Sequence, residues 1–315
     1  MYWGVQCSIY WKVLLILNTS IYFPLLQFGS ALTHYKEAHH IRCSRIGNNN
    51  FLLVDTHVAM GDAYCKMSMH TQADTCYCHA VQIMRQPFQY VSGGEGADNK
   101  PRSDLASLLL TWSNVKVDMG AIEDAIELLS QYLEIQKKEN GEQYMEEEML
   151  RRRAMLLLQQ GRDQEALTDF KEALRLVGAT KGPDNQTAGD ILHIMAVLHF
   201  HRGDLEIALG FARSALQIRI RKIMSLEAHR TRVANILIVI GNINCEMGRL
   251  QEAVQVFNWC LTLRMKELGP NNQKVAIVHV ALANTLFRQG NFCGAEQHFL
   301  AGNLIFLFFC QKFLE

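Results

Sequence analysis

The sequence predicts an all-α fold built as a solenoid of antiparallel helix pairs. Seven alanines recur along the chain, and the differences between their successive residue numbers are 42, 52, 41, 42, 45 and 42. In six of the seven units, a glycine or serine suited to a tight turn lies five positions before the alanine. A period of this length with two amphipathic segments per unit is typical of stacked helical hairpins. The alanines are Ala31, Ala73, Ala125, Ala166, Ala208, Ala253 and Ala295.

Each unit repeats the same pattern of buried positions. The first helix is expected to bury the residues 16, 13, 12 and 9 positions before the alanine, because spacings of 3, 1 and 3 mark one helical face. The second helix buries the alanine and the residues four and seven positions after it. A glycine such as Gly248 ends the first helix by adopting a left-handed backbone. Around Ala253, the predicted core residues are Leu237, Ile240, Gly241, Asn244, Phe257 and Cys260.

The array is predicted to occupy residues 15–302 in about seven repeats. Residues 1–14 form an apolar N-terminal segment without an assigned role. The longest gap contains a glycine-rich stretch near 87–101, which predicts a flexible insertion. Residues 303–315 form an apolar C-terminal tail. A terminal repeat normally needs a polar outer face. The tail therefore indicates either a truncated product or a segment that continues into, or docks on, further apolar surface.

The composition narrows the function classes and the compartment. Lysine plus arginine and aspartate plus glutamate both total 31, so the chain has no net positive charge that would attract nucleic acid. The nine cysteines lack the regular spacing of a disulfide-bonded domain. They therefore predict free thiols in a reducing compartment, which favours the cytoplasm. The apolar run 13–17 is far shorter than the roughly 20 residues that span a bilayer. Secretion or membrane anchoring is the weaker alternative.

No catalytic, cofactor or metal site is expected. The loop 92–96 lacks the lysine and serine of a phosphate-binding loop. Cys65, Cys76, Cys78 and His79 are close in sequence, but Cys76 and Cys78 point to different sides of a predicted helix. They therefore do not converge on one ion as a zinc site requires.

The segment Gly-Arg-Asp-Gln-Glu-Ala-Leu-Thr-Asp-Phe-Lys-Glu-Ala-Leu (161–174) resembles the tetratricopeptide repeat, and Gly-Arg-Leu-Gln-Glu-Ala-Val-Gln-Val-Phe (248–257) repeats the signature. The resemblance implies a right-handed superhelix whose first helices line a concave groove. The long repeat unit and the long links at 182–186 and 267–276 resemble kinesin light chain arrays. That family commonly places two asparagines mid-helix, whereas this chain has Ile238-Val239 and Val280-Ala281. The family's cargo chemistry is therefore not transferred.

One groove position per unit lies eleven residues before the alanine. An asparagine there can donate to and accept from the backbone of an extended peptide, whatever the peptide's sequence. The competing interpretation is that asparagine merely tolerates an exposed helical site. These positions are Asp62, Asn114, Met155, Val197, Asn242 and Asn284, three of which are asparagine.

Basic residues lie on or beside the same predicted face. Arg151, Arg152, Arg288 and Lys66 are candidates for pairing with a carboxylate of an acidic peptide or a chain terminus. Nearby acidic residues make the groove mixed rather than basic, and solvated helix faces are the competing explanation. His193 and His201 lie on the same predicted groove-facing side of the helix as Val197. Because histidine changes its charge near neutral pH, they predict pH-sensitive partner binding.

The sequence therefore predicts a non-enzymatic scaffold or adaptor that binds a peptide or helix of a partner protein in the groove. No nucleic acid or small-molecule substrate is expected. One alternative is a regulatory segment of a larger enzyme or signalling protein. Another is a structural solenoid that self-associates through its apolar ends.

Overall fold

The computed structural model describes residues 28–47, 50–86, 100–140, 147–221 and 228–312. The predicted N-terminal segment, the first helix of the first repeat and most of the predicted insertion lie outside these residues. The described residues form helices without strands, which confirms the all-α prediction. Their residue contacts group into two compact units, which we describe separately. The first comprises residues 1–145 and 155–161, and the second comprises 146–154 and 162–315.

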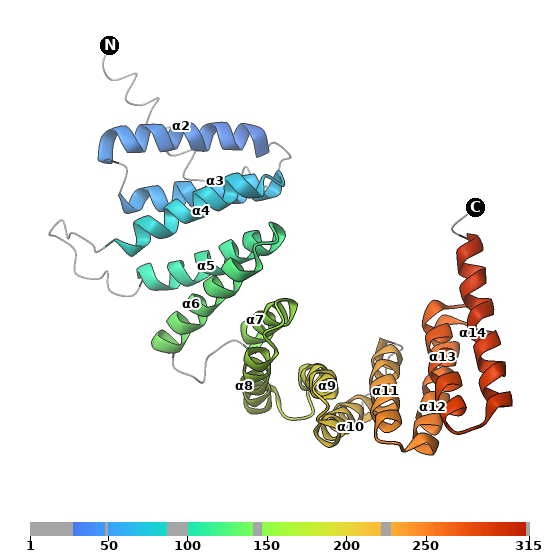
Figure 1. Ribbon diagram of the computed structural model, residues 1–315. Helices are drawn as coiled ribbons and strands as arrows, with labels where there is room; N and C mark the ends of the chain where they lie inside the picture. The colour runs from blue at the N-terminus through green and yellow to red at the C-terminus, as the bar shows by residue number, and fades with distance from the viewer. Residues whose placement is uncertain (1–27, 48–49, 87–99, 141–146, 222–227, 313–315) are drawn as a thin grey trace, which may run out of the picture. The chain divides into compact units, whose positions relative to one another are not determined.

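The first unit contains α2 and two helical hairpins (Figure 1). The helix α2 occupies the place of the second helix of the first predicted repeat, and it packs on α3. The hairpins α3–α4 and α5–α6 follow. The elements are α2 (Phe28–Ile46), the short 3-10 helix η2 (Phe51–Leu53), α3 (Val54–Lys66), α4 (His70–Arg85), α5 (Lys100–Asp118) and α6 (Ile122–Asn140).

The division between the units falls within α7 (Glu147–Gln159). The second unit continues with helices that follow one another in a row, each beside its sequence neighbours (Figure 1). The last helix, α14, continues past residue 302, where the predicted array ends, into the predicted C-terminal tail. The helices are α8 (Asp163–Lys181), α9 (Gln186–His201), α10 (Leu205–Arg221), α11 (Ala228–Glu246), α12 (Leu250–Leu268), α13 (Gln273–Arg288) and α14 (Phe292–Lys312).

The predicted core pattern is confirmed. All seven recurring alanines are buried, and so are the six other core residues predicted around Ala253. Phe257 is 1% exposed and packs in a cluster with Val233, Leu237 and Leu282, which belong to α11 and α13. In this repeat the second helix, α12, packs on the first helix, α11, and Leu282 of the following repeat joins the same apolar cluster. A solenoid built in this way depends on near-neighbour contacts.

The predicted turns are also confirmed. Gly120, Gly161, Gly203, Gly248 and Gly290 all have positive φ, and Ser68 adopts φ 58° in the equivalent place. At Gly248 (φ 74°), the amide of Arg249 donates to the carbonyl of Asn244 at 2.9 Å. The amide of Gly248 donates to Cys245 at 3.1 Å. These two bonds satisfy the last carbonyls of α11 and set α12 antiparallel to it.

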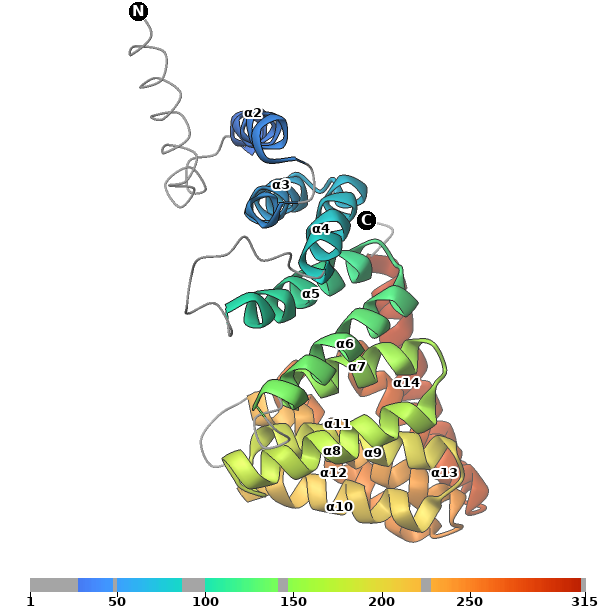
Figure 2. The same ribbon diagram turned by 90° about the vertical axis from the view of Figure 1, so that its left-hand side faces the viewer.

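A histidine cluster joins the first three helices, which are neighbours in both views (Figures 1 and 2). His39 Nε2 of α2 lies 3.3 Å from His57 Nε2 of α3, and the ring of His79 on α4 lies 5.4 Å from that of His57. Burial, followed by the charges of His39 and His79, lowers the pKa of His57 from 6.5 to about 4. Folding therefore favours the neutral imidazole at this position.

We expect this unit to lose stability as the pH falls from about 6.5 towards 4. In that window the unfolded chain binds a proton at His57 and the folded chain does not, so protonation favours unfolding. Above pH 6.5 the contribution is fully present. Urea unfolding followed by circular dichroism at pH 7.5, 6 and 5 measures the effect. The His57→Gln variant should have a flatter pH dependence, whereas an equally steep one would assign the loss to other groups.

Candidate partner-binding surface

In the second unit, Asn242 and Asn284 hold equivalent positions on α11 and α13, two helices that contact each other. Asn242 lies one turn before Glu246 on α11, and Asn284 lies one turn before Arg288 on α13. Arg288 Nη1 pairs with Glu246 Oε1 at 3.3 Å, which aligns the same faces of the two helices. We call these four residues the α11–α13 face. Asn242 is half-buried and Asn284 is exposed.

The adjacent helix α9 extends this row. Val197 holds the equivalent position on α9, and α9 contacts α11. Of the two histidines predicted to share the face of Val197, His201 is exposed and His193 is half-buried. Burial is the largest influence on His193 and lowers its pKa, with Asp190 opposing and Arg219 reinforcing the effect. The neutral imidazole of His193 is therefore favoured near pH 7.

In the first unit, Asn114 differs from the other two asparagines. Its Oδ1 is buried and has no hydrogen-bond partner among the described residues. On the same helix, Trp112 Nε1 donates to Asp74 at 2.6 Å, and Lys116 pairs with Asp74 and Asp124, both at 2.9 Å. Part of the Asn114 amide thus points inward. Lys66 is exposed in the last turn of α3.

The three consecutive arginines on α7 have different environments. Arg151 pairs with Glu148 on its own helix, and Arg152 is half-buried. Arg153 donates from Nε and Nη2 to both carboxylate oxygens of Asp169 at 2.7 and 2.6 Å. Asp169 is only 6% exposed. Sequence analysis missed this pair of residues.

A signal for that pair is present in the repeat pattern. Arg153 lies thirteen residues before Ala166, at a position that the pattern assigns to the core. Asp169 lies three residues after Ala166, where the α11–α12 repeat has Val256. A charge at a core position of the first helix, with an opposite charge next to a core position of the second helix, indicates an ion pair, because a lone buried charge is costly.

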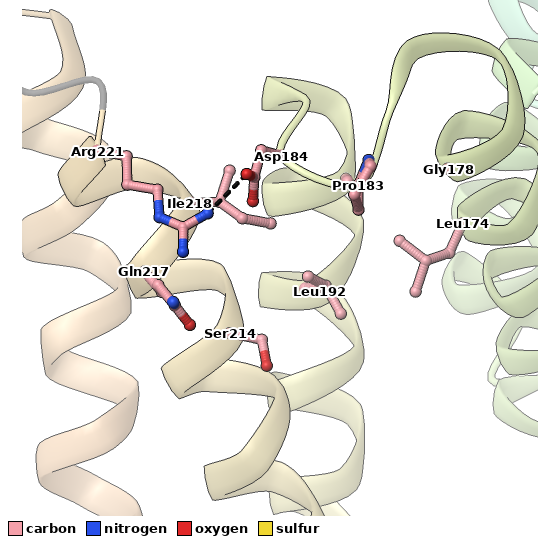
Figure 3. A pocket seen from close by; sticks show the side chains of 10 residues that line it. Leu174, Gly178, Pro183, Asp184, Leu192, Ser214, Gln217, Ile218 and Arg221 are labelled. Carbon is pink, nitrogen blue, oxygen red and sulfur yellow. Dashed lines mark hydrogen bonds and ion pairs between the residues drawn. The ribbon is translucent and has the colours of Figure 1, made fainter.

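A separate pocket of about 350 Å³ lies among α8, α9 and α10 (Figure 3). Leu174, Leu192 and Ile218 contribute apolar side chains to its lining, and Arg221 Nη1 pairs with Asp184 Oδ2 at 2.6 Å. None of the predicted partner-binding residues lines it. The lining residues are Leu174, Gly178, Pro183, Asp184, Ala188, Leu192, Ser214, Gln217, Ile218 and Arg221.

Two further observations limit the chemistry and the environment of the described residues. Among them, no three histidine, cysteine or acidic side chains converge as ligands for a metal ion. None of the helices in the described ranges combines the length and apolar character needed to cross a bilayer.

The tetratricopeptide repeat family matches residues 145–221 and 232–301. No curated protein sequence matches the chain. A crystal structure of BtubC (BKLC) from P. vanneervenii has a TM-score of 0.53 and 18% identity, and the match covers 77% of this chain and 91% of that chain. A putative kinesin light chain from Podosopora anserina, with nearly identical repeats, has a TM-score of 0.55 and 18% identity, with 66% and 97% covered.

A third solved structure covers more of the chain. It is a signal transduction ATPase with numerous domains from Pyrococcus horikoshii, which carries a tetratricopeptide repeat sensor. The TM-score is 0.61 at 14% identity, and the match covers 98% of this chain and 44% of that chain. At these identities, the similarities establish the fold.

Proposed function

We propose that this chain, which matches the tetratricopeptide repeat family over residues 145–221 and 232–301 and resembles kinesin light chain-type arrays, is an interaction scaffold for an extended segment of a partner protein. The repeat fold commonly serves as such a scaffold. The partner segment lies across the α11–α13 face and contacts Asn242 and Asn284. The protein acts in the cytoplasm and has no catalytic role of its own.

The alignment of Asn242 with Asn284 carries the proposal. The ion pair between Arg288 and Glu246 places the two amides on neighbouring first helices. Packed helices lie roughly 8–10 Å apart, and an extended chain rises about 3.3 Å per residue. Two amides at that separation match backbone groups about three residues apart on one extended peptide. Asparagine offers both donors and an acceptor, so each amide can bond to the peptide backbone.

The charges of this face favour recognition of the backbone over recognition of acidic side chains. Arg288 already pairs with Glu246, and Arg151 already pairs with Glu148. A partner carboxylate would have to displace a glutamate from either arginine. Exposed ion pairs stabilise a protein by only about 0–1 kcal/mol. Replacing the glutamate of such a pair with a carboxylate of the partner would therefore add little to the affinity for the partner.

The Asn242→Ala/Asn284→Ala double variant is expected to lower peptide affinity roughly tenfold. The loss corresponds to one or two hydrogen bonds at about 0.5–1.5 kcal/mol each. Panning a displayed library of random twelve-residue peptides with the full chain supplies the probe. Fluorescence polarisation with the selected peptide then gives the affinity of each variant.

The matched control removes two exposed amides from another helix, in the variant Gln251→Ala/Asn258→Ala on α12. Its affinity should equal that of the parent, and both double variants should retain helical circular dichroism. Asn114→Ala is tested separately because Asn114 belongs to the first unit and turns one oxygen inward. Equal affinity of the Asn242→Ala/Asn284→Ala variant and the parent would overturn the proposed contact.

The second candidate function is a regulatory segment of a larger signalling protein. It is favoured by the similarity of 98% of the chain to part of the multidomain ATPase with a repeat sensor. Sequencing the full transcript tests this candidate. A reading frame that continues into a further domain would support it, and a stop codon after Glu315 together with a start codon at Met1 would contradict it.

A further inference from the structure

The outward face of α14 carries a leucine stripe made of Leu300, Leu304 and Leu307. Their side chains are 57%, 66% and 62% exposed. The opposite face of the same helix packs on α13, because Ala295, Gly302 and Ile305 are buried. The stripe is therefore an outer surface of the last described hairpin, separate from its contact with α13.

Leucine is unusual at these three positions when α14 is compared with the second helices of the preceding repeats. They lie at the fifth, ninth and twelfth positions after the recurring alanine. In five preceding units these positions are mostly polar, as expected for a solvated helix face. The equivalent triplets are Cys78, Gln82 and Arg85; Ser130, Glu134 and Lys137; Lys171, Arg175 and Gly178; Arg213, Gln217 and Ile220; and Asn258, Thr262 and Met265.

The spacing of the stripe matches a two-helix seam. Leu300, Leu304 and Leu307 are four and three residues apart, and the exposed Gln297 and Cys293 extend the alternation towards the start of α14. Apolar residues at alternating spacings of three and four are the pattern by which two helices pack along a common seam. The neighbouring repeats have no such run, so repeat geometry does not explain it.

We propose that the leucine stripe pairs with the same stripe of a second copy of this chain. Between Gln297 and Gln311, the sequence of α14 contains no lysine, arginine, aspartate or glutamate. A partner with charged residues at this contact would bury them without counterions. A second copy of the chain would instead pack its own leucines against these leucines and bury no charge. A two-fold axis near Leu304 places Leu304 on its own counterpart, as a self-complementary dimer interface requires. This pairing is independent of the proposed peptide site on α11 and α13.

The dimer is expected to dissociate on dilution. Stable interfaces bury about 1,200–2,000 Å² in total, and three leucines from each chain form only the centre of such a contact. We therefore expect the weight-average mass of the full chain to rise from that of one chain towards that of two chains between about 1 and 100 µM. Sedimentation equilibrium over this range measures it.

Leu304→Glu tests the seam, and Thr262→Glu is its matched control. Both residues lie nine positions after the recurring alanine, and both are exposed, so neither change disturbs a core. Leu304→Glu places two glutamates against each other in the dimer, and buried unpaired charges are costly. We expect the dissociation constant to rise at least 100-fold, because each chain of the dimer would bury one unpaired glutamate. Thr262→Glu should dimerise like the parent.

Disulfide trapping provides a second readout. In a background where the exposed Cys293 is replaced (Cys293→Ser), Leu304→Cys should form disulfide-linked dimers under mild oxidation, and Thr262→Cys should not. A parent that remains monomeric at about 100 µM would overturn the proposal. So would a Leu304→Glu variant that dimerises normally. A monomer that sediments with phosphatidylcholine vesicles through Leu304 would instead assign the stripe to a lipid surface and would also overturn it.

Discussion

Gly241→Val is expected to unfold the α11–α12 hairpin under conditions in which the parent is folded. A Cβ at Gly241 would lie 2.4 Å from Cε1 and 2.5 Å from Cζ of Phe257. The ring cannot move aside easily, because Phe257 is 1% exposed and is surrounded by the core of α11 and α13. Overpacking a core costs about 1–3 kcal/mol and occasionally more. For a branched side chain this close to the ring, we expect a cost at the upper end of that range.

The comparison that isolates the contact is Gly210→Val. Gly210 lies within α10, is exposed, and has no heavy atom within 4 Å of an added Cβ. Urea unfolding should show little or no loss of stability for Gly210→Val and a large loss for Gly241→Val. Combining Gly241→Ala with Phe257→Leu should recover part of the stability lost by Gly241→Ala alone. Equal midpoints for Gly210→Val and Gly241→Val would show that the core yields to the added atoms.

Asp169→Ala is expected to cost about 3–5 kcal/mol of unfolding free energy, because it removes a buried carboxylate that accepts two hydrogen bonds from Arg153. Both nitrogen–oxygen distances are within 2.7 Å, and the aspartate is buried. The loss should vary little between about 0.05 and 0.5 M salt, because buried pairs are screened weakly. Urea unfolding at both salt concentrations measures it.

The Arg153→Ile/Asp169→Val double variant should be much more stable than Asp169→Ala. It copies Ile240 and Val256, which hold these positions in the α11–α12 repeat. Replacing a buried ion pair with apolar residues of suitable shape is often neutral or stabilising. Glu165→Ala is the surface control, since it removes the exposed partner of Arg162 and should change stability by about 0.5 kcal/mol or less. A similarly small loss for Asp169→Ala would contradict the expected dependence on the buried pair.

The periodic part of the structure could be predicted from the sequence. The alanines, the turn glycines and the core positions recur, so every unit provides a separate test of the same pattern. Ser68 fits this pattern although it is not a glycine, because its backbone adopts the same left-handed conformation. The division of contacts within α7 does not follow from periodicity, since the repeat around Ala166 has the same core pattern as its neighbours.

The candidate surface was predicted less completely. The position eleven residues before the alanine selects Asn242 and Asn284 as candidates, but it does not show that Arg288 pairs with Glu246. The distance between side chains one repeat apart depends on how neighbouring hairpins stack, and the spacing along a helix does not contain that information. Asn114 satisfies the same rule, yet its oxygen faces inward. A rule based on the face of one helix cannot distinguish an amide that points into the groove from one that rotates towards the core.

The contacts between neighbouring repeats also have a consequence for how such a chain can change in length. Arg288 and Glu246 are 42 residues apart, and Arg249 and Glu206, which pair at 3.1 Å, are 43 apart. Each pair thus joins residues about one period apart. A tandem gene duplication of one period would carry one half of such a pair at each end and restore the pair at each new junction. Unequal crossing-over could therefore lengthen or shorten the array while keeping each junction bonded.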